Sequence, residues 1–156
     1  MKGLVMYDSV HGNTKMIADA IAEELRAEGH EAVVRSAREG LPESLDADFI
    51  FIGSPTKIAK MTGKAKRVVK RLKKSSWGNK PVILFDTIMR TGGKEPEGKW
   101  AGTAADKMYN LAKELGLDAH AEVFHGVVTG MKGPLDKDSV ERTKVFVKDF
   151  LTNMRH

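Results

Sequence analysis

Short apolar runs alternate with amphipathic helical patterns along this sequence, and that alternation restricts the fold to a narrow class. The run at residues 49–52 is continuously apolar, as in a parallel strand buried on both faces, whereas Ile17, Ile21 and Leu25 recur at helical spacing. We expect strands at residues 2–7, 31–35, 49–52, 81–85 and within 119–128, and helices at 13–28, 63–74, 101–115 and 136–154. Five strands that alternate with helices predict an α/β fold, a single doubly wound domain over residues 1–156 with a parallel sheet and helices on both of its faces.

Composition limits the chemistry that such a chain can perform. The chain has 156 residues, of which 41% are apolar, and this is enough for one packed core. It contains no cysteine, which excludes disulfide bonds, thiol catalysis and cysteine-ligated metals. No apolar stretch approaches the length of a membrane span, and Met1-Lys2 leads into a strand without a signal-peptide pattern. We therefore expect a cytoplasmic protein with no membrane partner.

The six residues between the first predicted strand and the first predicted helix carry the strongest functional signal. They are Ser9, Val10, His11, Gly12, Asn13 and Thr14. A polar loop that enters a helix presents main-chain N–H groups at the positive end of the helix dipole, and Gly12 permits a tight turn close to a ligand. These features suit a phosphate cradle. Ser, Asn and Thr also favour the N-cap of ordinary helices, so the residues alone leave both interpretations open.

Two motifs resemble those of a known protein family. Ser-x-x-Gly-Asn-Thr at residues 9–14 resembles the phosphate loop of flavodoxins, and the longer run at 7–14 is also similar to the FMN domain of flavodiiron proteins. Gly53-Ser54-Pro55-Thr56 ends another apolar run, where these families place their second flavin loop. The resemblance implies the strand order 2-1-3-4-5 and FMN as the cofactor. The ligand would lie beyond the carboxyl ends of the first and third strands, where that order reverses.

The resemblance also implies which residues contact FMN, and it requires no catalytic side chain and no metal. The expected contacts are Ser9, Val10, His11, Gly12, Asn13 and Thr14 at the phosphate, Pro55, Thr56, Lys57 and Ile58 on one side of the isoalloxazine ring, and Asp86, Thr87, Ile88, Met89, Arg90, Thr91 and Gly92 on the other. Asp86 suits either the pyrimidine edge of the flavin or a cap within its own loop. His120 and His125 flank the fifth predicted strand on opposite faces, so we do not expect them to share a metal.

The sequence departs from the flavodoxin pattern around the expected ring site. Neither flavin loop, 54–62 or 86–97, contains an aromatic residue, and the first of them carries Lys57 and Lys60 where flavodoxins are generally acidic. The side chains available to pack on the ring instead are Ile58, Met61, Ile88 and Met89. We expect weaker cofactor binding, and the nearby cations should favour the anionic reduced flavin.

Positive charge is concentrated in one segment of the chain. Between Asp48 and Asp86 there are ten basic residues and no acidic ones, whereas the remaining residues include 16 basic and 21 acidic side chains. The segment 57–80 therefore predicts docking of an acidic redox partner, although a solvated lysine-rich helix face would have the same composition. The basic face has no interleaved aromatic residues, so nucleic-acid binding is not expected. We expect a monomer or a weak dimer.

Three functions are compatible with these features. The first is a small FMN electron carrier, in which the flavin performs the redox chemistry. The second is an FMN-dependent NAD(P)H:quinone reductase or related enzyme, with a substrate pocket formed by the long loop 86–98 and Arg90. The third is a flavin-free binding module that uses the basic surface. We expect the carrier, and we expect no enzymatic activity of its own.

Overall fold

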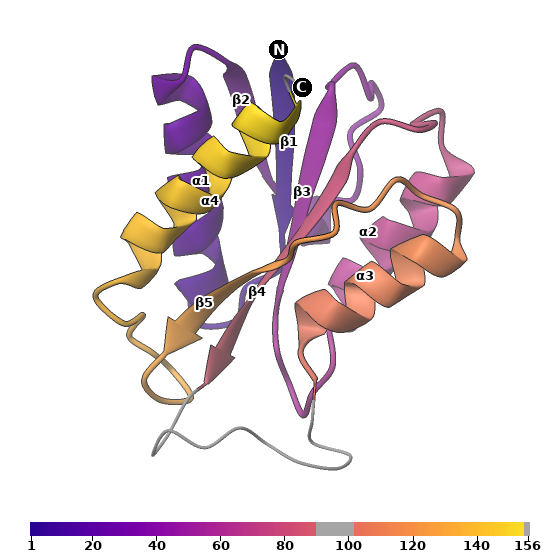
Figure 1. Ribbon diagram of the computed structural model, residues 1–156. Coiled ribbons are helices and arrows are strands. Elements are labelled where there is room, and N and C mark those ends of the chain that lie inside the picture. The colour runs from indigo at the N-terminus through magenta and orange to yellow at the C-terminus, as the bar shows by residue number, and fades with distance from the viewer. Residues whose placement is uncertain (90–101, 155–156) are drawn as a thin grey trace.

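Five parallel strands form the centre of the protein in the computed structural model, which describes residues 1–89 and 102–154 (Figure 1). The strands are β1 (Lys2–Tyr7), β2 (Glu31–Ser36), β3 (Phe49–Pro55), β4 (Val82–Met89) and β5 (Phe124–Val128). Their order across the sheet is β2-β1-β3-β4-β5, and all four neighbouring pairs are parallel. The predicted fold class and strand order are therefore confirmed.

In the part of the chain that the structure describes, four α-helices cover the two faces of this sheet. They are α1 (Asn13–Ala27), α2 (Gly63–Lys74), α3 (Ala104–Glu114) and α4 (Ser139–Met154), with a short 3-10 helix, η1, at Ala37–Glu39. Helices α1 and α4 lie together on one face, whereas α2 and α3 lie on the other (Figure 1). Among the residues that the structure describes, no helix is both long and apolar enough to cross a membrane.

The continuously apolar third strand supplies both cores, because successive side chains of a strand point to opposite faces. Phe49 and Phe51 pack against α1 and α4, and their rings meet the Phe150 ring edge to face at 5.3 and 5.5 Å between centroids. Ile50 and Ile52 point the other way, into the cluster that contains Leu72 and other residues of α2 and α3. Burial on both faces explains why this strand has no polar alternation.

The fourth strand continues further than the sequence predicted. Residues 86–89 belong to β4 and not to the following loop, because Asp86 and Thr87 pair with strands on both sides and Ile88 and Met89 pair with β5. Asp86 is opposite Ser54 in β3 and His125 in β5, and the pairing with β5 continues to Met89. The predicted strand end at residue 85 was wrong because a buried Asp and Thr looked like loop residues. Both polar side chains instead have hydrogen-bond partners inside the protein.

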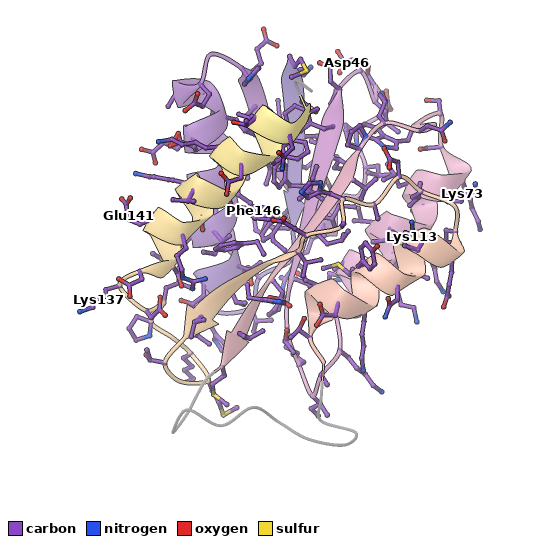
Figure 2. All side chains as sticks on the ribbon, in the orientation of Figure 1. Asp46, Lys73, Lys113, Lys137, Glu141 and Phe146 are labelled. Atoms are coloured by element: carbon purple, nitrogen blue, oxygen red, sulfur yellow. The ribbon has the colours of Figure 1, made fainter. Side chains whose placement is uncertain are left out.

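His120 gives the fold a pH dependence that can be measured. Its imidazole packs edge to face on Phe150, at 5.3 Å between centroids, and on Phe146, which Figure 2 labels on α4. Burial lowers the pKa of His120 below its ordinary value, while Glu122 and Asp118 partly oppose the shift. Between the folded-state pKa and about 6.5, the unfolded chain therefore binds more protons than the folded chain, so stability falls as the pH falls through this range.

We accordingly expect His120→Leu to reduce the acid sensitivity of folding. Wild-type protein and variant should each be unfolded with urea at pH 7.5 and at pH 5. The quantity to compare is the decrease in unfolding free energy between pH 7.5 and pH 5 in each protein. The loss should be smaller in the variant, because it has no imidazole to protonate on unfolding. An equal loss in both proteins would show that His120 does not contribute to acid sensitivity.

Candidate functional site

The turn between β1 and α1 leaves main-chain donors available at the carboxyl end of the sheet. Gly12 precedes the helix with a left-handed backbone (φ +89°), and the Ser9 hydroxyl accepts a hydrogen bond from the Gly12 N–H at 3.0 Å. Within the described residues no side chain caps α1, and its first turn has no acidic residue. Because the first N–H groups of a helix have no intrahelical acceptor, this helix end suits an anion. The structure thus favours the phosphate cradle over an ordinary side-chain cap.

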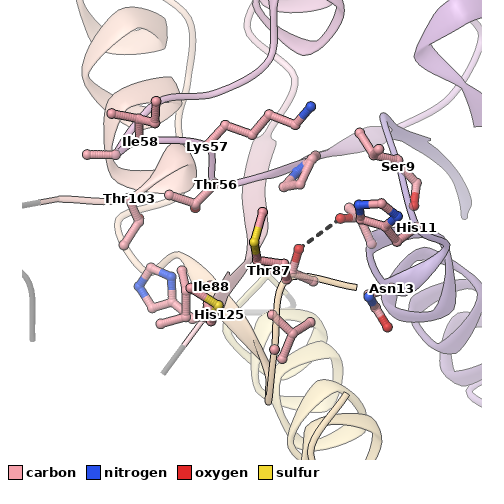
Figure 3. A pocket seen from close by; sticks show the side chains of 18 of the residues that line it. Ser9, His11, Asn13, Thr56, Lys57, Ile58, Thr87, Ile88, Thr103 and His125 are labelled. Carbon is pink, nitrogen blue, oxygen red and sulfur yellow. Dashed lines mark hydrogen bonds between the residues drawn. The ribbon is translucent and has the colours of Figure 1, made fainter. Parts of the chain in front are cut away.

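Thr14 and Thr87 join this helix end to the sheet. Their hydroxyl oxygens lie 2.9 Å apart in a buried position, and a dashed line beside Thr87 in Figure 3 marks the bond. Two hydroxyl groups carry two hydrogens, and the bond between them uses one. The pair therefore retains one donor for a further acceptor. This bond fixes Thr14, at the N-terminus of α1, against Thr87 of β4.

A tight turn forms the opposite wall. The N–H of Lys57 donates to the carbonyl of Lys60 and the reverse bond is also made, both at 2.9 Å. The two residues between them, Ile58 and Ala59, have positive φ angles of 50° and 60°, which matches a type I′ turn. This conformation is unusual for a β-branched residue, and it leaves the Ile58 side chain 66% exposed at the cleft.

Together these segments enclose a cleft of about 940 Å³, a size typical of cofactor sites. Ser9, His11 and Asn13 lie on one side of it and Lys57, Ile58 and Thr103 on the other, with Thr87 between them (Figure 3). The predicted residues that line the cleft are Ser9, Val10, His11, Asn13, Thr14, Pro55, Thr56, Lys57, Ile58, Thr87, Ile88 and Met89. Gly12 shapes the turn beside it. Arg90, Thr91 and Gly92 lie outside the described residues.

Asp86 does not belong to the cleft wall. Its side chain is fully buried beneath the N-terminus of α3, where it accepts hydrogen bonds from the Ala105 N–H at 2.8 Å and from the Thr56 hydroxyl at 3.4 Å. Of the two interpretations of Asp86, the structure supports a capping role, although the capped element is α3 and not its own loop. Because Asp86 is fully buried and does not line the cleft, its contact with the flavin stays a prediction.

The first turn of α3 is closed to an anion, in contrast to that of α1. The Ala104 N–H donates to the Thr56 hydroxyl oxygen at 3.0 Å, and the Ala105 N–H donates to Asp86. The Asp106 N–H donates to the Thr103 hydroxyl oxygen at 3.2 Å. With its donors satisfied and a buried carboxylate beside it, this helix end repels a phosphate. The N-terminus of α1 therefore suits a phosphate better than the N-terminus of α3 does.

Several residues of the cleft could not be recognised in the sequence. Thr103 and Asp106 reach it from the start of α3, His125 from β5, and Gly130 and Met131 from the following loop. None belongs to a motif, and each enters the cleft because the parallel sheet brings the carboxyl ends of its strands to one edge. The sequence reasoning considered His125 only together with His120 and did not expect the two to share a metal; they do lie on opposite faces as expected.

The cleft combines two features. The uncapped N-terminus of α1 suits a phosphate, and the apolar side chains on its walls suit a flat apolar ring. These apolar residues are Val10, Pro55, Ile58, Ile88 and Met89. The site lies where the strand order reverses between β1 and β3. Fold and site together define a doubly wound α/β protein whose cleft, at the carboxyl edge of its sheet, suits a phosphate-bearing cofactor.

Comparison with known proteins identifies the family. The model of the flavodoxin domain matches residues 4–142, so the chain belongs to the flavodoxin domain family. A flavodoxin from Aquifex aeolicus (strain VF5) is 38% identical over 94 residues, or 59% of this chain, and the match spans only about half (51%) of that relative's length.

Solved structures agree with this assignment. A flavodoxin from the domain Archaea matches with a TM-score of 0.79 and 25% identity over 100% of both chains. Flavodoxin from Fusobacterium nucleatum, solved bound to flavin mononucleotide, matches with a TM-score of 0.69 and 12% identity over 97% of this chain and 98% of that one. The second likeness supports the fold alone.

Proposed function

We propose that this protein binds FMN in the cleft and acts as an electron-transfer flavodoxin. The observation that carries the proposal is the uncapped N-terminus of α1 beside an apolar cleft, in a chain that matches the flavodoxin domain. Bound FMN would supply a redox centre that accepts and releases electrons, so no catalytic side chain is needed. The main chain around Gly12 and the Thr14–Thr87 pair would hold the phosphate, and Ile58, Ile88 and Met89 would contact the ring.

Flavin uptake by the purified protein tests this function. We expect a visible flavin spectrum that survives desalting, or that returns at one FMN per chain when the cofactor is added. Isolated holoprotein should accept electrons from dithionite and should not oxidise NADH or NADPH by itself. Failure to bind FMN would overturn the proposal, and steady NAD(P)H turnover would replace the carrier with the reductase.

The exposed cations of α2 support an acidic partner. Lys64, Lys66, Arg67, Lys70, Arg71, Lys73 and Lys74 all point to solvent, and none pairs with an acidic side chain within the described residues. Figure 2 shows Lys73 on this side of the molecule, with Lys113 of α3 beside it. Lys57 and Lys60 extend the basic surface to the rim of the cleft. We propose that an acidic redox protein docks here, next to the cofactor.

We expect the charge next to the cleft to accelerate electron transfer to an anion. Replacement of Lys60, Lys64 and Arg67 by Gln should slow the oxidation of the reduced protein by ferricyanide about tenfold at low ionic strength, and added salt should remove the difference. The matched control replaces Lys137, Lys144 and Lys148, which lie at or near α4, by Gln. It makes the same change in net charge and should alter the rate less than twofold. Equal slowing in both triple variants, measured by stopped-flow absorbance, would argue against a local docking surface.

The missing ring aromatics give a second expected result. Ile58→Tyr places an aromatic side chain at the rim of the cleft, in a turn where the wild-type β-branched residue is already strained. We expect FMN to bind up to about tenfold more tightly, which is near the upper end of the range for one aromatic stacking contact. Val145→Tyr, at an exposed position of α4, is the control and should leave the Kd unchanged. An unchanged Kd in Ile58→Tyr, measured by fluorescence titration, would place the ring elsewhere.

A single domain over residues 1–156, a monomeric or weakly dimeric state and a cytoplasmic location remain predictions. Limited proteolysis, size-exclusion chromatography and cell fractionation would test them in that order.

A further inference from the structure

A buried carboxylate and an imidazole form a pair at the edge of the cleft. Asp86 and His125 lie opposite each other in the pairing of β4 with β5, and Asp86 Oδ1 is 2.7 Å from His125 Nδ1. The Asp86 side chain is fully buried, whereas the His125 side chain is 30% exposed and its ring lines the cleft (Figure 3). A titratable ring therefore faces the cofactor site while a carboxylate holds it from behind.

The geometry determines which ring nitrogen can change its protonation state. Asp86 accepts from the Ala105 N–H and the Thr56 hydroxyl at Oδ2, which leaves Oδ1 to accept from His125 Nδ1. An ionised carboxylate only accepts hydrogen bonds, and Nδ1 of His125 consequently carries a hydrogen. The second titratable position of the ring is Nε2. A carboxylate in direct contact also stabilises the protonated, positively charged form of the ring.

Other charged groups surround the pair. Arg142 of α4 donates to the His125 carbonyl oxygen at 3.0 Å and opposes a second positive charge nearby. Asp106 of α3 lines the same cleft and favours that charge. Lys57 and His11 line the other walls. Among the described residues, Asp86 makes a hydrogen bond with the ring, so its charge acts directly on whether the ring is protonated.

We propose that His125, positioned by Asp86, takes up a proton when electrons reach the cleft and so couples the redox equilibrium to pH. The inference rests on the proposed FMN function. The electron comes from a donor protein or an electrode and stays on the cofactor, while the proton comes from water and binds Nε2 of His125. Oxidation returns both, and no covalent bond is made. The positive ring then offsets the negative charge that reduction adds to the cleft.

Thermodynamic linkage makes this coupling measurable from both sides. If protonated His125 strengthens binding of reduced FMN relative to oxidised FMN, reduction must strengthen proton binding by His125 by the same factor. A unit charge several ångströms away in a partly solvated site changes an equilibrium by on the order of tenfold. We therefore expect reduction to strengthen proton binding by His125 about tenfold, and protonation of His125 to strengthen binding of reduced FMN relative to oxidised FMN about tenfold.

Histidine titration by NMR measures the proton directly. The imidazole signals should be followed from pH 5 to 9 in apoprotein, in oxidised holoprotein and in dithionite-reduced holoprotein. The titration midpoint of His125 should rise by about one pH unit on reduction, which is the same tenfold factor. His120 lies on the opposite face of the sheet against α4 and is the internal control, whose midpoint should not move. A His125 midpoint unchanged by reduction would overturn the proposal.

Matched variants measure the cofactor side of the coupling. His125→Gln retains a donor for Asp86 but cannot gain charge, and His120→Gln is the control. At pH 5 the ratio of the affinities for reduced and oxidised FMN should be about tenfold lower in His125→Gln than in wild type, and at pH 9 the two should agree. The flavin's own protonation contributes to both proteins and cancels in the comparison. A pH-independent difference, or the same loss in His120→Gln, would overturn the coupling.

Asp86→Asn tests the positioning residue through the same titration. Asn can still accept from the Ala105 N–H, so α3 retains its capping bond, but the negative charge is removed. We expect the midpoint of His125 to fall in all three states. A failure of wild-type protein to bind FMN would overturn the proposed function itself, whereas FMN binding without the His125 shift would overturn only this inference.

Discussion

Gly12→Val is expected to raise the Kd for FMN at least about 100-fold, since it would disrupt at least two of the hydrogen bonds proposed between the main chain and the charged phosphate. Gly12 has a φ of +89°, a conformation that costs a β-branched residue roughly 1–2 kcal/mol or forces the turn to rearrange. A Cβ at this position meets no atom within 4 Å, so the effect comes from backbone conformation and not from a clash. Rearrangement moves the N–H groups around residues 10–14 away from the phosphate.

Gly29 provides a matched control for this substitution. It has the same φ of +89°, it also has no atom within 4 Å of a built Cβ, and it lies beyond the opposite end of α1. Gly29→Val should therefore lose a similar amount of stability while binding FMN normally. Gly12→Asn, which tolerates a left-handed backbone, should recover most of the affinity. If fluorescence titration gives equal Kd values for Gly12→Val and Gly29→Val, the α1 N-terminus is not the phosphate site.

Gly53→Ala is expected to destabilise the fold by about 3 kcal/mol, the upper part of the range for an overpacked core. A Cβ on Gly53 would fall directly on the ring of Phe85, its neighbour in β4. Phe85 is fully buried among residues of α1 and α4, so its ring can shift only if its close-packed neighbours shift with it. Gly53 is therefore required by the aromatic ring beside it, and not by a positive φ.

Urea unfolding of two further variants isolates that cause. Gly63→Ala, at the start of α2, has no atom within 4 Å of the new Cβ and should leave stability within about 0.5 kcal/mol of wild type. Combining Gly53→Ala with Phe85→Leu removes the clashing ring, and the double variant should lose less than the sum of the two single losses. Additive losses would mean that the ring and the Cβ do not meet.

The alternation of apolar runs and helical patterns was sufficient to predict the fold class, and the flavodoxin resemblance supplied the strand order. The first motif was informative because main-chain donors follow from the position of Gly12 between a strand and a helix. The second motif also has a structural role. The Ser54 hydroxyl accepts a hydrogen bond from the Thr62 N–H at 3.0 Å and so supports the turn before α2.

Features that depend on tertiary pairing escaped prediction. Asp86 and Thr87 looked like loop residues because their partners, Ala105, His125 and Thr14, come from distant segments. The type I′ turn at Ile58 was missed because it contains neither glycine nor asparagine, the residues that normally mark such a turn. His125 entered the site through the register of β5 against β4, which no local pattern contains.

The cleft takes its walls from five separate chain segments, spanning positions from Ser9 to Met131. No single supersecondary unit contains all of these segments. The cofactor would therefore have its full set of contacts only when the whole sheet has formed. A ligand that binds the folded chain alone adds stability as its concentration rises, by about 2.7 kcal/mol at 100 times the Kd. Cellular supply of the cofactor would thereby set how often the chain opens to proteases, and the lifetime of the protein would follow the size of the flavin pool.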